Sequence, residues 1–183
     1  MKWKLTFVLA AGIATLSFCA WFSWESFVLR PVPPHQGDGE FEDLSFRYGP
    51  FAVRGYSISM PAFDLGDSFK AEYRISGLTQ IRQKCGVYLA VRDPQFIGFA
   101  ADGGELHFEV TDSMGRSVVK VGGNLSEFIH WQAGDEFHGF YQMEKSFFNP
   151  DRREEYRIRI SYTAGRKLAG HKGFVYVRCG GEI

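Results

Sequence analysis

The sequence lacks a net charge of either sign: its 183 residues include 21 Lys and Arg and 21 Asp and Glu. A neutral chain without a basic stripe has no field that would gather nucleic acid, so we expect no nucleic-acid partner. The chain also lacks the residue spacings of familiar enzymes and metal proteins, because it contains no GxSxG, no HExxH and no twelve-residue calcium loop. These absences predict a protein that is not an enzyme and holds no metal or cofactor.

Long helical periodicity is absent as well, whereas aromatic residues and glycine are plentiful, with 18 Phe, 8 Tyr, 4 Trp and 21 Gly. That composition favours strands and turns. One segment, 86–91, is apolar on both faces, as an interior strand is. Apolar and polar side chains alternate, as in half-buried strands, over 69–76, 105–110 and 156–162. Weaker strand patterns occur around 44–48, 56–60, 117–121, 137–143 and 174–179. We therefore predict an all-β fold, an antiparallel β-sandwich of jelly-roll or immunoglobulin-like topology.

The longest hydrophobic run lies at the N-terminus, over residues 5–24, directly after Lys2 and Lys4. As a helix it would be about 30 Å long, enough to cross a membrane, and the lysines would keep its start in the cytoplasm. We therefore divide the chain into a signal peptide or signal-anchor transmembrane helix (1–29), a Pro/Gly-rich tether (30–40) and the sandwich domain (41–183).

Three fates compete for this hydrophobic segment. It could stay as a single-pass anchor, it could be cleaved so that the protein is secreted, or it could end at a lipidated cysteine. The tetrad Leu16-Ser17-Phe18-Cys19 resembles a bacterial lipobox that would lipidate Cys19, although Phe18 stands where a small residue is expected. All three fates deliver the domain to the periplasm or the extracellular space.

Two cysteines, Cys85 and Cys179, lie in the domain, each in a strand-like run. In an oxidising compartment they are expected to form one disulfide, the alternative being two buried free thiols. The triplet that starts at Asn124 is an N-glycosylation sequon, although the same asparagine could equally cap a single helical turn over 124–131.

Six aromatic residues gather between positions 131 and 148, and we single out Trp131, Phe140, Phe147 and Phe148 as a candidate ligand or partner surface. Exposed aromatics on a sandwich would support sugar rings or form hot spots for protein partners, whereas buried ones would only fill the core. His130 and His138 flank a glycine turn and could meet across a hairpin, and scattered aspartates lie in turns beside glycine.

The alternating strand Tyr156–Tyr162 resembles the penultimate strand of jelly-roll carbohydrate-binding modules, a resemblance that covers one strand and carries over no ligand residues. Our first hypothesis is a membrane-tethered or exported domain that binds a protein partner, as an envelope assembly factor or an immunity-type inhibitor does. The alternatives are a carbohydrate-binding module that uses exposed aromatics and a hydrolase with dispersed carboxylates.

Overall fold

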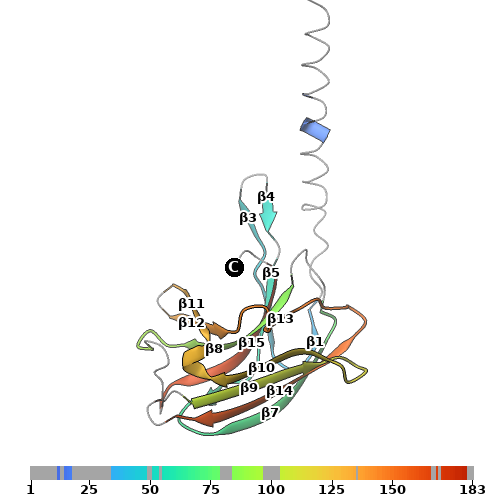
Figure 1. The fold of residues 1–183 in the computed structure, drawn as a ribbon. Helices are drawn as coiled ribbons and strands as arrows, with labels where there is room; N and C mark the ends of the chain where they lie inside the picture. Colours follow the sequence, from blue (N-terminus) through green and yellow to red (C-terminus); the bar gives the residue numbers. More distant parts are fainter. Residues whose placement is uncertain are drawn as a thin grey trace, which may run out of the picture.

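The structure, a computed structural model, describes residues 12, 15–17, 34–48, 51–53, 55–78, 84–96, 104–134, 136–165, 168 and 170–180. Nearly all regular structure among them is antiparallel β, in two main sheets that lie one over the other (Figure 1). Alternation explains how the strands form. In β14 (Glu155–Ala164), for example, Ile158 and Ile160 are buried while Arg159 between them is exposed.

The first sheet has five strands, and each of its long strands turns one apolar face inward. Its order is β1 (Gln36–Gly37), β7 (Phe69–Ser76), β14, β9 (Gly104–Thr111) and β10 (Ser117–Asn124). β14 lies between β7 and β9, so its register with both fixes which side chains face the core.

The second sheet has eight strands. Its path runs β11 (Ile129–Ala133), β12 (Phe137–Tyr141), β8 (Cys85–Arg92), β15 (Lys172–Gly180), β5 (Gly55–Ser59) and β2 (Glu40–Asp43). Two short strands pair with its centre, β13 (Phe147–Phe148) with β8 and β6 (Phe63–Asp64) with β15. A separate hairpin of β3 (Phe46–Tyr48) and β4 (Phe51–Val53) projects from β2 and β5 (Figure 1).

The strand order distinguishes the two expected topologies. Eight strands lie in the orders β5–β15–β8–β12 and β7–β14–β9–β10, so the chain passes repeatedly from one sheet to the other. In an immunoglobulin-like sandwich the first two strands share a sheet, whereas β5 and β7 lie in different sheets here. The order therefore matches a jelly roll.

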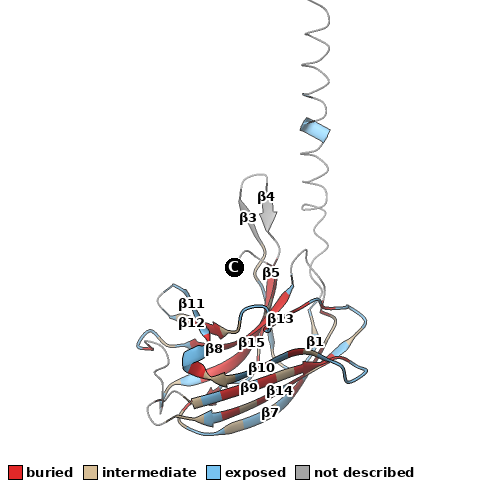
Figure 2. Cartoon of the chain, viewed as in Figure 1, coloured by how far each residue is buried: buried red, intermediate tan, exposed pale blue. Residues whose placement is uncertain are grey.

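A single core fills the space between the sheets, as the buried residues along both show (Figure 2). Tyr162 on β14 donates its hydroxyl proton to the carbonyl of Leu65 over 2.8 Å, so this buried phenol keeps a hydrogen bond. The eight-stranded sheet contributes, among others, Ile58, Val87, Leu89 and Val175, and the five-stranded sheet Phe108, Val110, Val121 and Ile158.

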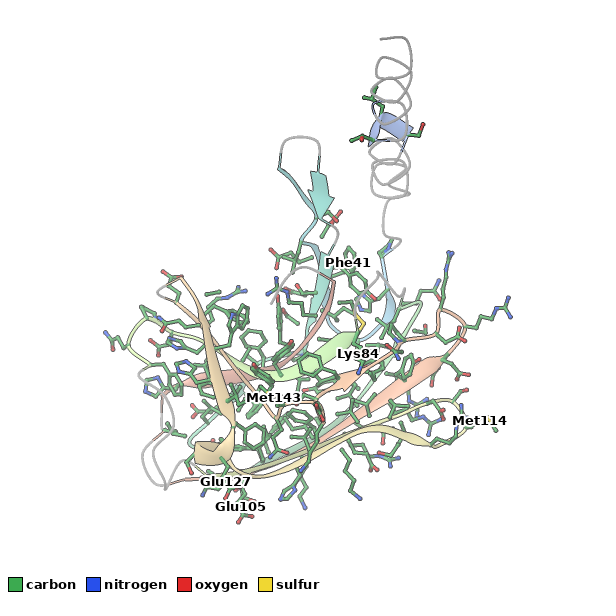
Figure 3. All side chains as sticks on the ribbon, turned by 45° about the horizontal axis from the view of Figure 1, so that its top comes forward. Phe41, Lys84, Glu105, Met114, Glu127 and Met143 are labelled. Atoms are coloured by element: carbon green, nitrogen blue, oxygen red, sulfur yellow. A yellow bond between two sulfur atoms is a disulfide. The ribbon has the colours of Figure 1, made fainter. Side chains whose placement is uncertain are left out.

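Cys85 and Cys179 form the predicted disulfide, drawn in yellow in Figure 3 near the labelled Lys84. They lie directly opposite each other on the paired strands β8 and β15, with their α-carbons 4.1 Å apart. Both are fully buried. The bridge therefore joins the two central strands of the eight-stranded sheet across 94 residues of chain.

Two sequence predictions need correction, and a third is confirmed with one addition. Part of the expected tether is folded, because β1 at residues 36–37 pairs with β7 and Glu40 opens β2. The strand expected over 44–48 is interrupted, since the Asp43 carboxylate accepts the backbone N–H of Ser45 between β2 and β3. The single helical turn is confirmed as a 3-10 turn at Leu125–Glu127, after which the chain forms strand β11, which the sequence did not predict.

Of the hydrophobic segment, only residues 12 and 15–17 are described, and they are helical. The rest of the predicted N-terminal helix, including Cys19, lies outside the described residues. Within the part of the chain that the structure describes, no helix is both long enough and apolar enough to span a membrane.

Candidate functional site on the outer face of the eight-stranded sheet

The outer face of the eight-stranded sheet is covered by aromatic rings. Alternate residues of β8 point to opposite sides, so Val87 and Leu89 enter the core while Tyr88 and Ala90 face outward. The register sets Tyr88 opposite Tyr176 on β15. We call this surface the aromatic face, and it comprises Tyr88, Trp131, Phe137, Tyr141, Phe147, Phe174 and Tyr176.

Edge-to-face contacts hold these rings together. The ring centroids of Tyr88 and Tyr141 are 5.6 Å apart at 70°, and those of Phe137 and Tyr176 are 5.0 Å apart at 62°. Such arrangements place the positive edge of one ring against the negative face of the next. The aromatic face is therefore a second, smaller hydrophobic cluster on the side of the sheet away from the main core.

Two glycines inside strands let rings lie close to the backbone. A Cβ on Gly139 would lie 2.8 Å from the ring of Trp131, and one on Gly86 would lie 2.7 Å from ring carbons of Tyr88. Contacts that short do not occur between real side chains, so only glycine leaves room for these rings.

The rings differ in their contact with solvent. Tyr88 is 1% exposed and Tyr176 6% exposed, so these two side chains form the buried inner layer of the aromatic face. Burial raises the pKa of both phenols, which keeps them neutral. The outer layer is formed by half-buried rings that remain accessible, Trp131, Phe137, Tyr141 and Phe147.

Two arginines lie on the aromatic face. The guanidinium carbon of Arg178 is 5.3 Å from the ring centroid of Trp131, and that of Arg92 is 5.9 Å from the ring centroid of Phe174. Both distances fall within the range of cation–π attraction. The Nε of Arg178 is buried and has no hydrogen-bond partner among the described residues.

A cleft of about 890 Å³ continues this surface toward β2. Its walls include Phe174 and Arg92 from the aromatic face, and Lys172 from the start of β15. Across β5 and β2 the register sets Ser59 opposite Glu40, and both line the cleft together with Glu42. One surface thus passes from aromatic rings to hydroxyl, carboxylate and cationic groups.

The structure divides the four aromatics that the sequence singled out. Phe140 is 2% exposed and Phe148 5%, so both belong to the core and the prediction that they form a surface is wrong for them. Trp131 and Phe147 do lie on the aromatic face. Phe147 and Phe148 pair with Gly86 and Cys85, which face opposite sides of β8, so the neighbouring rings separate.

Sequence reasoning missed the contributions of β8 and β15 to this face. A signal was present, because both strands are apolar on their two faces although one face already supplies the core. An unexplained second apolar face indicates a second contact surface. The missed residues are Tyr88, Arg92, Phe174, Tyr176 and Arg178.

The other candidate groups have local roles. Asn124 caps the 3-10 turn, its side-chain oxygen accepting the N–H of Ser126 over 2.9 Å, while its glycosylation stays a prediction. Asp64 and Asp93 likewise each accept a backbone N–H two residues ahead, as turn aspartates do. The Gln95 N–H, followed by the neighbouring His171, lowers the pKa of Asp93.

His130 and His138 do meet across the β11–β12 hairpin, with Nε2 of the first 3.0 Å from Nδ1 of the second. Burial, followed by the proximity of His138, lowers the pKa of His130. In the described segments no group of three or more His, Cys, Asp or Glu is placed to hold a metal ion. The pair is therefore a hydrogen-bonded contact between strands.

Comparison with known proteins names no family. No family model matches the sequence, and no curated protein is similar to it in sequence. Among solved structures, the carbohydrate-binding module TmCBM27, described for its specific recognition of mannan, aligns with 83% of this chain and 91% of its own at 14% identity and a TM-score of 0.36. A likeness that distant carries no argument about the ligand of this chain.

Proposed function

We propose that this protein is a non-catalytic, exported module that binds polysaccharide on the outer face of its eight-stranded sheet. The observation that carries the proposal is the continuity of the aromatic face with the cleft beside β2. Partly exposed aromatic rings, cationic side chains and carboxylates occupy one surface, from Trp131 on β11 to Glu40 on β2.

A sugar ring needs both kinds of group. Its C–H face is apolar and packs against an aromatic ring, while its hydroxyls both donate and accept hydrogen bonds. On the aromatic face Trp131 and Phe147 offer accessible rings, while in the adjoining cleft Glu40 and Glu42 accept and Arg92 and Lys172 donate. Six strands about 4.8 Å apart give the surface a width of roughly 24 Å, enough for several sugar units.

The export of the domain is part of the same proposal. The Cys85–Cys179 disulfide suits an oxidising compartment, and the hydrophobic run over 5–24 suits a leader or an anchor. A domain held outside the cytoplasm by a segment of this kind would meet cell-wall or extracellular glycans.

Affinity electrophoresis tests the proposal. The full-length protein in mild detergent is run through native gels that contain neutral or acidic soluble polysaccharides. We expect at least one polysaccharide to retard it, and we expect Trp131→Ala and Phe147→Ala to reduce the retardation because these rings face the ligand. Met114→Ala is the matched control, since Met114 is 76% exposed in the turn between β9 and β10. Retardation that both aromatic variants retain in full would remove this site.

A protein partner is the second candidate, and one observation favours it. Two exposed apolar residues border the aromatic face: Ile129, 38% exposed opposite Tyr141, and Met143, 66% exposed and labelled in Figure 3. Trp, Tyr, Arg and Met are also enriched in protein interfaces. Crosslinking in intact membranes that captures one protein, and loses it with Ile129→Asp and Met143→Asp, would support this candidate.

A further inference from the structure

The aromatic face and its cleft carry cations that have no carboxylate partner among the residues that the structure describes. Among the described residues, neither Arg92, Lys172 nor Arg178 forms an ion pair, although Glu40 and Glu42 line the same cleft as the first two. The three cations all come from β8 and β15, the central strands of the sheet.

The opposite sheet is built differently. On its outer face Arg159 lies 2.8 Å from Glu72, Arg74 lies 3.9 Å from the same carboxylate, and Arg157 lies 3.9 Å from Glu155. Each of these arginines has a carboxylate within 4 Å, with Arg159 and Arg74 sharing Glu72, as is usual for solvated strands. The unpaired arginines on the aromatic face therefore do not follow from the general composition of the protein.

Arg178 is the most constrained of the three cations. Its guanidinium lies over the ring of Trp131, and its buried Nε has no acceptor among the residues that the structure describes. A buried donor without a partner is costly, and a carboxylate is the acceptor that the guanidinium fork fits best. Arg178 as a whole is only half-buried, so an anionic group beside Trp131 would meet the accessible part of this guanidinium.

The spacing of the cations favours a long ligand. Arg178 pairs in register with Gly86, and Gly86 lies six residues from Arg92 along β8, roughly 20 Å in an extended strand. A small anion would contact one cation, whereas a polymer with repeated negative charges would contact both ends. We infer that the polysaccharide ligand is acidic, with carboxylates that meet Arg178 and the Arg92–Lys172 end and with hydroxyls directed to Glu40 and Glu42. This inference rests on the proposed function.

Binding to polygalacturonate and to its methyl ester tests the inference, because the two polymers share a backbone and differ in charge. In isothermal titration of the full-length protein in detergent, the affinity for polygalacturonate is expected to be about tenfold or more higher than for the methyl ester. That factor corresponds to the free energy of one charge-assisted hydrogen bond. Arg178→Gln and Arg92→Gln are each expected to weaken binding similarly, and rising salt should weaken it too. Arg159→Gln on the opposite sheet is the matched control and should bind as wild type.

The possible failures are distinguishable. Equal binding of the methyl ester, or binding of neutral mannan without polygalacturonate, would overturn the acidic ligand and leave the proposed function standing. Dextran sulfate that binds wild type as tightly as polygalacturonate does, and that Arg178→Gln weakens equally, would reduce the effect to unspecific charge and also overturn the acidic-sugar ligand. If no polysaccharide binds, both proposals fail. Since Arg178 is half-buried, urea unfolding checks its variant, and exposed Arg92→Gln gives an independent result.

Discussion

Removal of the Cys85–Cys179 disulfide should cost the domain a large part of its stability. The bridge closes a loop across 94 residues, and the chain-entropy relation gives a contribution of about 4.7 kcal/mol for a loop of that length. Domains have total stabilities of about 5–15 kcal/mol, so the reduced form should be marginal. With a urea dependence of about 2 kcal/mol per molar, the unfolding midpoint should fall by roughly 2 M.

Urea unfolding, followed by circular dichroism, measures this effect on oxidised protein, reduced protein and the Cys85→Ala/Cys179→Ala variant. The double variant separates loss of the bridge from effects of the reductant, and Cys19→Ala serves as the control because Cys19 is not a partner in the bridge. A reduced protein whose midpoint stays within about 0.5 M of the oxidised one would refute the reasoning. So would a thiol titration that finds three free cysteines in protein purified without reductant.

Three further predictions concern the aromatic face and its neighbours. Phe148→Ala should lower the unfolding free energy by about 3–5 kcal/mol because it leaves a cavity in the core, whereas Phe147→Ala should lower it much less. Equal decreases of the unfolding free energy in urea would contradict their placement on opposite faces of the sheet. Gly139→Ala should displace the ring of Trp131. Thermal melts should then show a destabilisation of about 1–3 kcal/mol, and affinity gels should show weaker retardation. A variant unaffected in both assays would show that the ring does not lie against Gly139. The pKa of His130 is lower in the folded than in the unfolded chain, so the unfolded state binds more protons and the unfolding free energy should fall as the pH drops through about 6.5. His130→Gln should flatten the slope of unfolding free energy against pH. An unchanged slope would exclude His130 as its source.

The strands were predictable because alternation records which face is buried. In β7, β9 and β14 every second side chain is apolar, and the register of all three follows from one requirement, that these faces meet in the core. The disulfide was predictable for a related reason, since Cys85 and Cys179 each continue an inward-facing apolar row.

Strand β11 could not be predicted from the residues in and before it. Leu125, Phe128 and Ile129 fall at helical spacing, yet the chain forms only three residues of 3-10 helix before pairing with β12. Pairing with a neighbouring strand outweighs a weak local preference for helix, and the sequence of one segment does not show which strand it will pair with. The edge position of β11 also leaves it exposed, which removes the alternation that marks other strands.

The candidate site was only partly predictable, because burial decides which aromatics are accessible at the surface. Phe140 and Trp131 lie in the same hairpin, but one enters the core and the other lies over Gly139 on the outside. The cations Arg92 and Arg178 come from strands far apart in sequence, and only the pairing of β8 with β15 and β12 brings them to one surface. That neither has a carboxylate partner in the described part of the chain is a property of the fold, which no local sequence pattern predicts.

Fluorescence of Trp131 tests the binding face most directly, since it is the only tryptophan beyond residue 24. In a variant with Trp3, Trp21 and Trp24 replaced by phenylalanine, titration with polygalacturonate should shift the emission saturably and shield the indole from acrylamide. The same titration on the Phe147→Ala form should need more ligand to reach saturation, because Phe147 is one of the accessible rings. Emission and quenching that stay constant across acidic and neutral polysaccharides alike would contradict a glycan-binding role for this surface.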